Sequence, residues 1–288
     1  EPVAICRLKR VAADYKGDIR SRLPTPAAKG NGKRVALVGA GPASLTVARD
    51  LAPHGYQCVV FDGDPKAGGM MRTQIPKFRL PDRVIDEECG YVLDLGVEFR
   101  AGTRVDSMAS LLADGYDAVF VGSGAPRGRD LDIPGRREAA KRIHIGIDWL
   151  SSVSFGHTTS IGKRVVVLGG GNTAMDCCRS ARRLGGEDVH VVVRSGFDEM
   201  KASPWEKEDA AHEGIPIHNF LVPKAFLHEH GILRGITFDK VEARYDSKGR
   251  RELVPTGEPE VRFECDDVIV AVGQENAFPW IERDIGIE

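Results

Sequence analysis

One stretch of the sequence occurs twice, as GKRVALVGAG at residues 32–41 and as GKRVVVLGGG at residues 162–171. In each copy a run of four apolar residues, typical of a strand covered on both faces, leads into Gly-x-Gly and then into a helix-like segment. In such a loop the first glycine permits a tight turn and the second lets the backbone approach a phosphate. The helix start then stabilises the negative charge. The repeat predicts two sites for the pyrophosphate of a dinucleotide.

The two copies differ at the end of the following strand, where Rossmann-like folds place the residue that meets the adenosine ribose. Asp62 follows the apolar run 59–61, and its carboxylate suits both ribose hydroxyls. Arg194 follows the run 191–193 and suits a ribose 2′-phosphate. We therefore expect FAD at the first site and NADP at the second. Both side chains could instead be ordinary strand-end charges that face solvent.

Composition sets the limits of the prediction. With 288 residues and 42% hydrophobic content, the chain is long enough for about two domains. The net charge of -2 offers no general attraction to nucleic acid or anionic membrane. No apolar stretch approaches the roughly 20 residues that span a bilayer, and no signal peptide opens the chain. The cytoplasm is the expected compartment, and a start at Glu1 is consistent with a piece of something longer.

The cysteines and histidines predict neither a metal site nor a redox disulfide. Six cysteines are scattered without a Cys-x-x-Cys spacing, whereas a flavin disulfide reductase would carry two of them close together. Cys177 and Cys178 are adjacent in an expected helix, where packing in the core is the favoured interpretation. His228 and His230 suit a solvated surface better than a metal site.

The apolar patterns predict an α/β fold with two Rossmann-like dinucleotide-binding domains, the NAD(P)-binding one inserted into the FAD-binding one. We expect a lead-in over residues 1–31, the first part of the FAD domain over 32–150, the NAD(P) domain over 151–272, and an incomplete return over 273–288. The expected strands and helices are the following: strands 34–38, 57–61, 97–99, 116–122, 189–193 and 266–273, short strands within 215–263, and helices from Pro42, over 82–95, over about 172–184 and within 195–213. The proline-bounded stretch 75–81 is expected to be extended, a shape that can lie against a flat ring.

Several motifs together carry a family resemblance: Gly39-Ala40-Gly41-Pro42-Ala43, Gly68-Gly69, Ile75-Pro76-Lys77-Phe78-Arg79-Leu80-Pro81 and Gly169-Gly170-Gly171-Asn172-Thr173-Ala174-Met175-Asp176. Over nearly its whole length the chain resembles the small subunit of glutamate synthase and the flavin and NADPH domains of dihydropyrimidine dehydrogenase. The resemblance implies an FAD-dependent NAD(P)H oxidoreductase in which hydride passes between nicotinamide and flavin. It also implies that single electrons pass through iron–sulfur clusters.

The same resemblance assigns cofactor-binding residues. Those implied for FAD are Gly39, Gly41, Pro42, Ala43 and Asp62 around the adenine dinucleotide, with Gly68, Gly69, Arg79 and Leu80 along the ribityl chain and ring. Those implied for the nicotinamide nucleotide are Gly169, Gly171, Asn172, Thr173 and Arg194. Asp176 is expected to fix the helix or the domain interface rather than to touch ligand. No side chain is expected to act as a catalytic acid or base, because the two cofactors carry the chemistry.

The chain departs from the family pattern in three ways. Ser44 stands at the usual third glycine, where it is expected to tighten packing without abolishing phosphate binding. Ser195 stands where NADP-using relatives often have a second arginine, so NAD remains an alternative; Lys201 could compensate, or could simply be solvated. Neither a cysteine-rich cluster segment nor a downstream Gly-Asp flavin motif is present. The iron–sulfur clusters are therefore expected only on a partner subunit or a missing segment.

The leading hypothesis is a subunit that passes electrons between a nicotinamide nucleotide and a partner through FAD. One alternative is a self-contained flavoprotein that resembles ferredoxin reductase. Another is a non-catalytic nucleotide-binding module. Retention of flavin and its bleaching by NADPH or NADH would discriminate among these hypotheses.

Overall fold

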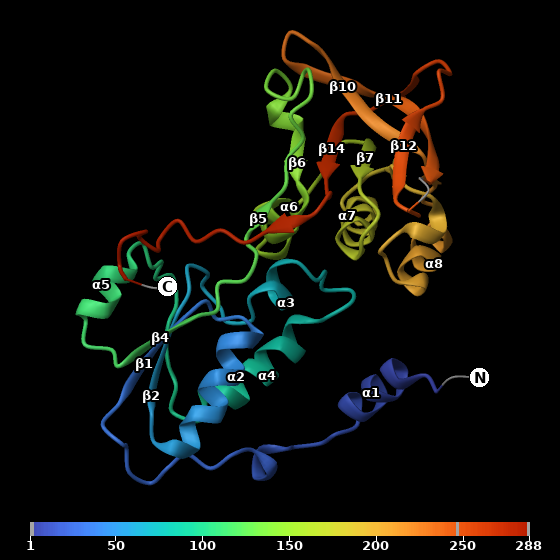
Figure 1. Cartoon of the computed structure of the whole chain (residues 1–288). Coiled ribbons are helices and arrows are strands. Elements are labelled where there is room, and N and C mark those ends of the chain that lie inside the picture. The colour runs from blue at the N-terminus through green and yellow to red at the C-terminus, as the bar shows by residue number, and fades with distance from the viewer. Residues whose placement is uncertain (1–2, 246–247, 287–288) are drawn as a thin grey trace. The chain divides into compact units, whose positions relative to one another are not determined.

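The structure is a computed structural model that describes residues 3–245 and 248–286 (Figure 1). The chain forms two compact units. Unit 1 comprises residues 1–69, 83–123 and 279–288, and unit 2 comprises residues 70–82 and 124–278. Unit 2 is thus entered twice from unit 1, once for a short segment and once for the long insertion.

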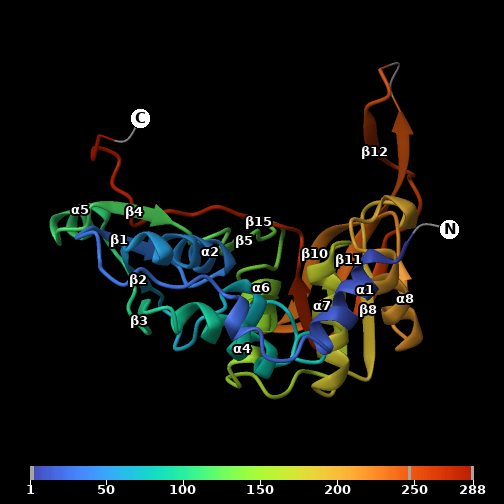
Figure 2. The same ribbon diagram turned by 90° about the horizontal axis from the view of Figure 1, so that it is seen from below.

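Unit 1 is built on a parallel sheet of four strands in the order β3-β2-β1-β4. The strands are β1 (Arg34–Val38), β2 (Gln57–Phe61), β3 (Glu98–Arg100) and β4 (Ala118–Val121). Residues 35–38 and 58–61 are buried throughout, as their continuous apolar runs predict. Helix α2 (Pro42–Leu51) begins with proline at its first position and packs on β1 and β2 (Figures 1 and 2).

Further helices of unit 1 surround this sheet or precede it: α1 (Ile5–Asp14), α4 (Asp82–Leu93), α5 (Met108–Ala113) and the short turns η1 (Arg20–Arg22) and η2 (Ala52–His54). The helix expected over 82–95 is confirmed as α4. Ser107 caps α5 by accepting a hydrogen bond from the amide of Ser110.

Unit 2 is built on a parallel sheet of five strands in the order β6-β14-β7-β8-β9. These are β6 (Ile143–Ile145), β7 (Arg164–Leu168), β8 (Asp188–Val192), β9 (Ile217–His218) and β14 (Asp267–Val270). One face packs against α7 (Asn172–Arg183), with α6 (Gly146–Ser154) and α8 (Pro204–His212) adding to the same core. The other face packs against antiparallel strands.

The antiparallel strands confirm the expectation for residues 215–263. They are β10 (Leu221–Glu229), β11 (Ile232–Tyr245), β12 (Arg251–Pro255) and β13 (Val261–Glu264), and β11 pairs with the other three. Three short elements of unit 2 are α3 (Met70–Thr73), η3 (Ala140–Arg142) and η4 (Phe197–Glu199). A two-stranded ribbon joins β5 (Arg127–Gly128) to β15 (Gln274–Glu275).

The two parallel sheets repeat one plan. In unit 1, β1 lies between β2 and β4; in unit 2, β7 lies between β8 and β14. The strands expected at 116–122 and 266–273 therefore occupy equivalent places, which explains why their sequences are alike. Just after each of these strands, a backbone amide donates a hydrogen bond to the last residue of the central strand. The amide of Gly122 donates to the carbonyl of Val38 and that of Ala271 to the carbonyl of Leu168, both at 2.8 Å.

Two features differ from the sequence expectation. Residues 76–80 form a turn rather than an extended stretch, because the amides of Arg79 and Leu80 both bond to the Pro76 carbonyl, at 2.9 and 3.0 Å. The sheet of unit 2 also begins earlier than expected, since β6 pairs with β14. The boundary expected at residue 150 therefore lies inside unit 2, whose second segment begins at Gly124.

Within the described residues, none of the helices combines the length and the apolar character that a membrane crossing requires.

Candidate functional site

The first glycine of each repeated loop is fixed by backbone conformation and space. Gly39 has φ +95° and Gly169 has φ +139°, in the region that side chains rarely adopt. A Cβ added to Gly39 would lie 2.6 Å from the carbonyl oxygen of Gly122, and one added to Gly169 would lie 2.2 Å from that of Ala271. Both distances are too short for a carbon atom in contact with an oxygen. These glycines therefore serve the turn itself, as expected.

The second glycine of each loop caps a helix and leaves its first turn open. Gly41 and Gly171 are the N-cap residues of α2 and α7, and neither helix start is capped by a side chain of the described residues. The first turns, 42–45 and 172–175, contain no carboxylate. An added Cβ at Gly171 would meet nothing within 4 Å among those residues. Each helix start is therefore shaped to accept an anion.

A second pair of glycines lies against the loop of unit 1. Gly68 donates its amide to the carbonyl of Ala40 at 2.9 Å. A Cβ at Gly69, which has φ +50°, would lie 2.6 Å from the Cα of Gly41. Only glycine permits this approach, so the structure brings Gly68 and Gly69 to the phosphate loop. Their contact with flavin stays a prediction.

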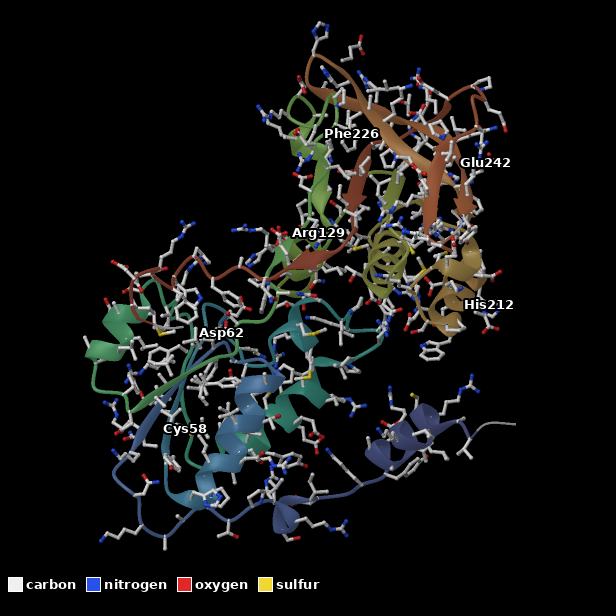
Figure 3. All side chains as sticks on the ribbon, viewed as in Figure 1. Cys58, Asp62, Arg129, His212, Phe226 and Glu242 are labelled. Atoms are coloured by element: carbon white, nitrogen blue, oxygen red, sulfur yellow. The ribbon has the colours of Figure 1, made fainter. Side chains whose placement is uncertain are left out.

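Asp62, labelled in Figure 3, lies directly after β2, and its carboxylate contacts the same loop. Its Oδ2 accepts the Ala40 amide at 2.6 Å and its Oδ1 accepts the Asp64 amide at 2.9 Å. A carboxylate held by two backbone donors has a fixed direction and keeps further lone pairs for ribose hydroxyls. Pro42 and Ala43 are the first two residues of α2 and lie close in sequence to Ala40, whose amide donates to Asp62.

Ser44 is fully buried, and its Oγ has no hydrogen-bond partner among the described residues. The hydroxyl of Ser44 faces Gly122, because a Cβ added to Gly122 would lie 2.1 Å from the Ser44 Oγ. The side chain that replaces the third glycine of the motif is thus accommodated by a glycine opposite. The packing expected of Ser44 is present, at the cost of an unsatisfied hydroxyl.

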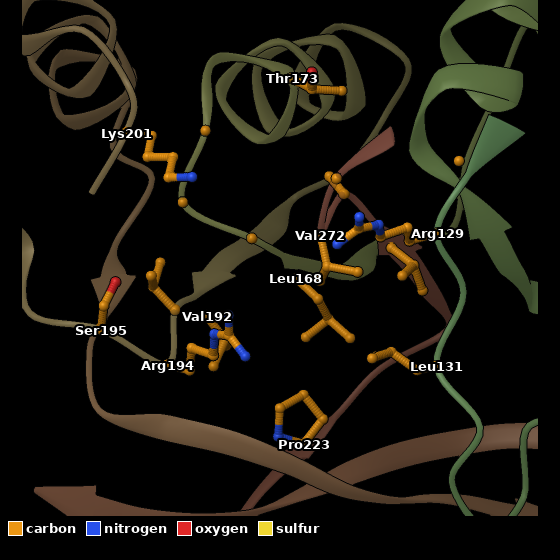
Figure 4. A pocket seen from close by; sticks show the side chains of 18 of the residues that line it. Arg129, Leu131, Leu168, Thr173, Val192, Arg194, Ser195, Lys201, Pro223 and Val272 are labelled. Atoms are coloured by element: carbon orange, nitrogen blue, oxygen red, sulfur yellow. The ribbon is translucent and has the colours of Figure 1, made fainter. Parts of the chain in front are cut away.

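Unit 2 contains a cavity of about 790 Å³ at the carboxyl ends of its parallel strands, the usual place for ligands in such sheets (Figure 4). Except for Asn172, every residue that the sequence assigned to the second nucleotide lines it: Gly169, Gly171, Thr173, Arg194 and Lys201. Its apolar wall includes Leu168, Val192 and Val272. The structure therefore brings these residues to one cavity from separate segments, and their contact with a nucleotide stays a prediction.

The cations of this cavity come from several segments. Figure 4 shows Arg129, Arg194 and Lys201 around one space. Arg194 is exposed and follows β8, and Ser195 beside it also lines the wall. Asn172 lies just outside the lining; its Oδ1 accepts the amide of Ser203 at 2.8 Å. This bond joins the start of α7 to the start of α8.

Arg79 belongs to an ion-pair cluster of unit 2. Its guanidinium contacts Asp176 Oδ2 at 2.7 Å and Glu206 Oε1 at 2.5 Å. Both carboxylates are buried, with side-chain exposures of 6% and 4%. Burial raises the pKa of Asp176 to about 6, although Arg79 opposes that rise. Asp176 thus fixes α7 to residues 70–82, and the flavin roles of Arg79 and its half-buried neighbour Leu80 stay predictions.

The cysteines are placed as structural residues. Cys58, Cys89, Cys177, Cys178 and Cys265 are buried and Cys6 is exposed. Burial raises the pKa of Cys177 well above its usual value and that of Cys178 to about 12. A buried, protonated thiol is a poor nucleophile. No group of three or more potential metal-ligating side chains lies within residues 3–245 and 248–286.

Sequence reasoning missed two arginines of the cavity. Arg129 follows the short strand β5, and Arg251 opens β12. Neither stands in a glycine motif or at the end of an apolar strand. Both reach the cavity through strand pairings that are distant in sequence.

Comparison with known proteins gives a consistent result. The model of the family described as pyridine nucleotide-disulphide oxidoreductase matches residues 33–288. The chain is 36% identical over 313 residues to the NADP(+)-dependent formate dehydrogenase subunit beta of Moorella thermoacetica, covering 100% of this chain and 44% of that protein. It is 35% identical over 295 residues to the NADPH-Fe(3+) oxidoreductase subunit beta of Geobacter sulfurreducens, with the same coverages. The chain thus spans less than half the length of these two relatives.

The expected similarity to the small subunit of glutamate synthase is confirmed. The chain is 32% identical over 298 residues to the glutamate synthase (NADPH) small chain of Escherichia coli, covering 98% of this chain and 62% of that one. Among solved structures, FprA from Mycobacterium tuberculosis matches with a TM-score of 0.72 and 19% identity, covering 85% of this chain and 72% of FprA. The thioredoxin reductase of Lactococcus lactis matches with 0.66 and 20%, covering 88% and 82%. These likenesses confirm the predicted fold with two dinucleotide-binding domains.

Proposed function

Because the chain belongs to the pyridine nucleotide-disulphide oxidoreductase family, whose members include FAD-dependent NAD(P)H oxidoreductases, we propose that it passes reducing equivalents between NADPH and FAD. We propose further that it acts as a subunit and exchanges single electrons with an iron–sulfur partner. The observation that carries the proposal is the cavity of unit 2, in which the glycine loop, the start of α7 and Arg194 line one space.

The residues present fit both cofactors. For FAD, Gly69 lies so close to Gly41 that a Cβ added to Gly69 would be 2.6 Å from the Cα of Gly41, and the start of α2 lies open beside them. Side chains at these glycines would fill the cradle. For the nicotinamide nucleotide, Gly171 offers an open helix start and Thr173 a hydroxyl. Bound flavin and nicotinamide supply the hydride chemistry, and the protein supplies their position.

The chain's own residues then have defined tasks. The amides at the starts of α2 and α7 bind pyrophosphate oxygens, and the two carboxylate oxygens of Asp62 orient a ribose. Arg194 and Lys201 supply positive charge for a ribose 2′-phosphate, which favours NADP over NAD. The buried and protonated cysteines argue against thiol–disulfide exchange as the reaction, in spite of the family's descriptive name.

The role as a subunit is supported by the names of the relatives. One similar chain is the beta subunit of an NADP(+)-dependent formate dehydrogenase, and another is the beta subunit of an NADPH-Fe(3+) oxidoreductase. The glutamate synthase relative is likewise a small chain. Hydride transfer delivers two electrons to a flavin at once, whereas an iron–sulfur cluster carries one electron. A flavoprotein that exchanges electrons with such clusters links the two kinds of transfer, and we therefore include an iron–sulfur partner in the proposal.

An anaerobic titration tests the nucleotide and flavin sites together. The purified chain, reconstituted with FAD, is titrated separately with NADPH and NADH while the visible flavin absorbance is followed. We expect bleaching at lower concentrations of NADPH than of NADH. In the variant Arg194→Gln, the concentration of NADPH needed for half-bleaching should rise about tenfold, while that of NADH changes little.

The outcomes separate the hypotheses. If FAD is not retained, or neither nucleotide bleaches it, the oxidoreductase proposal is wrong and a non-catalytic nucleotide-binding module is favoured. If NADPH reduces the flavin and the chain alone then reduces free ferredoxin at a high rate, a self-contained reductase is favoured over a subunit. Equal responses to NADPH and NADH would refute the role given to Arg194 but leave the two-site architecture intact.

A further inference from the structure

Arg251 lines the cavity of unit 2 together with Arg194, Ser195 and Lys201. It is the first residue of β12, and β12 pairs with the end of β11 through contacts that include Tyr245 opposite Arg251. The antiparallel hairpin therefore carries a cation from a distant part of the sequence to the end of the cavity where the adenosine ribose is expected.

The position of Arg251 is fixed by Glu199. The guanidinium forms an ion pair with Glu199 Oε2, and the same oxygen accepts the amide of Gly196 at 2.9 Å. The other carboxylate oxygen accepts the hydroxyl of Tyr245 at 3.1 Å. Glu199 thus joins the hairpin to the loop that begins at Arg194. Because Gly196 is only two residues from Arg194, this joint holds Arg251 near the ribose-binding arginine.

The charges and donors at this end of the cavity suit a dianion. Arg194, Lys201 and Arg251 are cationic, and Glu199 is the carboxylate that faces Arg251. The hydrogen bond from Arg251 is the main cause that lowers the pKa of Glu199. A guanidinium has five N–H donors, so Arg251 can bind Glu199 and a phosphate oxygen together. Its side chain is 27% exposed, which limits its freedom without removing it from the cavity.

We propose that Arg251 is a specificity-determining residue that binds the ribose 2′-phosphate of NADP together with Arg194, in place of a cationic residue at position 195. The inference rests on the proposed function, because it presumes a nicotinamide nucleotide in the cavity of unit 2. According to this inference, discrimination between NADP and NAD depends partly on the β11–β12 hairpin and not only on residues near the glycine motif.

The test compares the binding of NADP⁺ and NAD⁺ by equilibrium titration of the full chain. The variant Arg251→Gln removes the charge and keeps hydrogen-bonding capacity. We expect its Kd for NADP⁺ to rise roughly tenfold, with the Kd for NAD⁺ unchanged within about twofold. The matched control is Arg244→Gln, since Arg244 lies on β11 of the same hairpin, pairs with Glu242, and has a 66% exposed side chain. It should leave both constants unchanged.

A second variant distinguishes phosphate binding from mere anchoring of the hairpin. In Glu199→Gln the anchor is weakened but the negative charge beside the phosphate is removed. A phosphate-binding Arg251 predicts that the preference for NADP⁺ is kept or increased. A structural role for the ion pair predicts that Glu199→Gln weakens both nucleotides, as Arg251→Gln would.

Each result bears on a different proposal. If the wild-type chain binds neither nucleotide, the proposed function is wrong, and this inference is wrong with it. If the wild type binds NADP⁺ and Arg251→Gln weakens NADP⁺ and NAD⁺ equally, or weakens neither, the inference is overturned and the proposed function stands. A wild type that prefers NAD⁺ overturns the inference and also the NADP preference assigned to Arg194, but it leaves the proposed exchange of reducing equivalents between a nicotinamide nucleotide and FAD standing.

Discussion

The substitution Gly171→Ala separates the fold from nucleotide binding. Gly171 is the N-cap of α7 with φ -102° and ψ 175°, a conformation open to alanine. An added Cβ would meet nothing within 4 Å among the described residues. The loss of stability should therefore be only about 1 kcal/mol or less, the difference between glycine and alanine at an N-cap.

The effect on binding should be much larger. The new methyl group would occupy the space through which a phosphate reaches the amides at the start of α7. A hydrogen bond to a charged group contributes about 1.5–3 kcal/mol. Loss of one such bond raises the Kd for NADP⁺ by roughly tenfold to a hundredfold. Thermal unfolding measures the first quantity and equilibrium titration with NADP⁺ the second.

The matched control is Gly90→Ala in α4, where an added Cβ also meets nothing within 4 Å of the described chain. Inside a helix this change should stabilise slightly and leave the Kd unchanged. Gly169→Ala gives the opposite extreme, since its Cβ would lie 2.2 Å from the Ala271 carbonyl oxygen, and it should prevent proper folding of unit 2. If Gly171→Ala binds NADP⁺ as tightly as the wild type, the helix start is not the phosphate site.

Three further predictions concern other parts of the chain. Gly69→Ala should reduce the flavin content of the purified protein, because its Cβ would lie 2.6 Å from the Cα of Gly41; an unchanged ratio of flavin to protein absorbance would contradict this. The pKa of Asp176 is raised by burial to about 6, so its contribution to stability is fully present only below about pH 4 and is lost as the pH rises from there to about 6; the total loss is roughly 3 kcal/mol, about half of it above pH 5. Asp176→Asn should lack that loss, and urea unfolding at about pH 5 and about pH 8 measures it; an identical pH dependence in both proteins would refute the assignment. In the native protein a thiol reagent should modify the exposed Cys6 and spare the buried Cys177 until the chain is unfolded, whereas rapid modification of Cys177 would show that α7 opens readily.

Local rules account for what could be predicted from the sequence. The two glycine loops, their strands and Asp62 or Arg194 depend on residues within a few positions of each other, so that periodicity and turn chemistry suffice. For the same reason α2 and α7 were expected near their observed bounds. The shared cavity lining of Gly169, Thr173 and Arg194 follows once the strands are parallel and adjacent.

Elements that depend on distant partners escaped prediction. The strand β6 has only three residues, with His144 between two isoleucines, and the start of its sheet becomes clear only when it pairs with β14. The turn at 76–80 carries Arg79, whose buried partners Asp176 and Glu206 are far away in sequence. Arg251 reaches the cavity only through the register of β12 on β11. Local patterns contain no information about such pairings.

Residues 70–82 belong to unit 2 although they are separated in sequence from the rest of it, and this affects any attempt to express unit 2 alone. A fragment spanning 124–278 would contain Asp176 and Glu206 but not Arg79, and Ser154 would lose the Arg72 carbonyl to which its hydroxyl donates at 2.5 Å. Two carboxylates would then remain buried with one fewer counter-ion. To express unit 2 on its own, residues 70–82 would have to be joined to residues 124–278 through a linker, or the two segments would have to be supplied together as separate polypeptides.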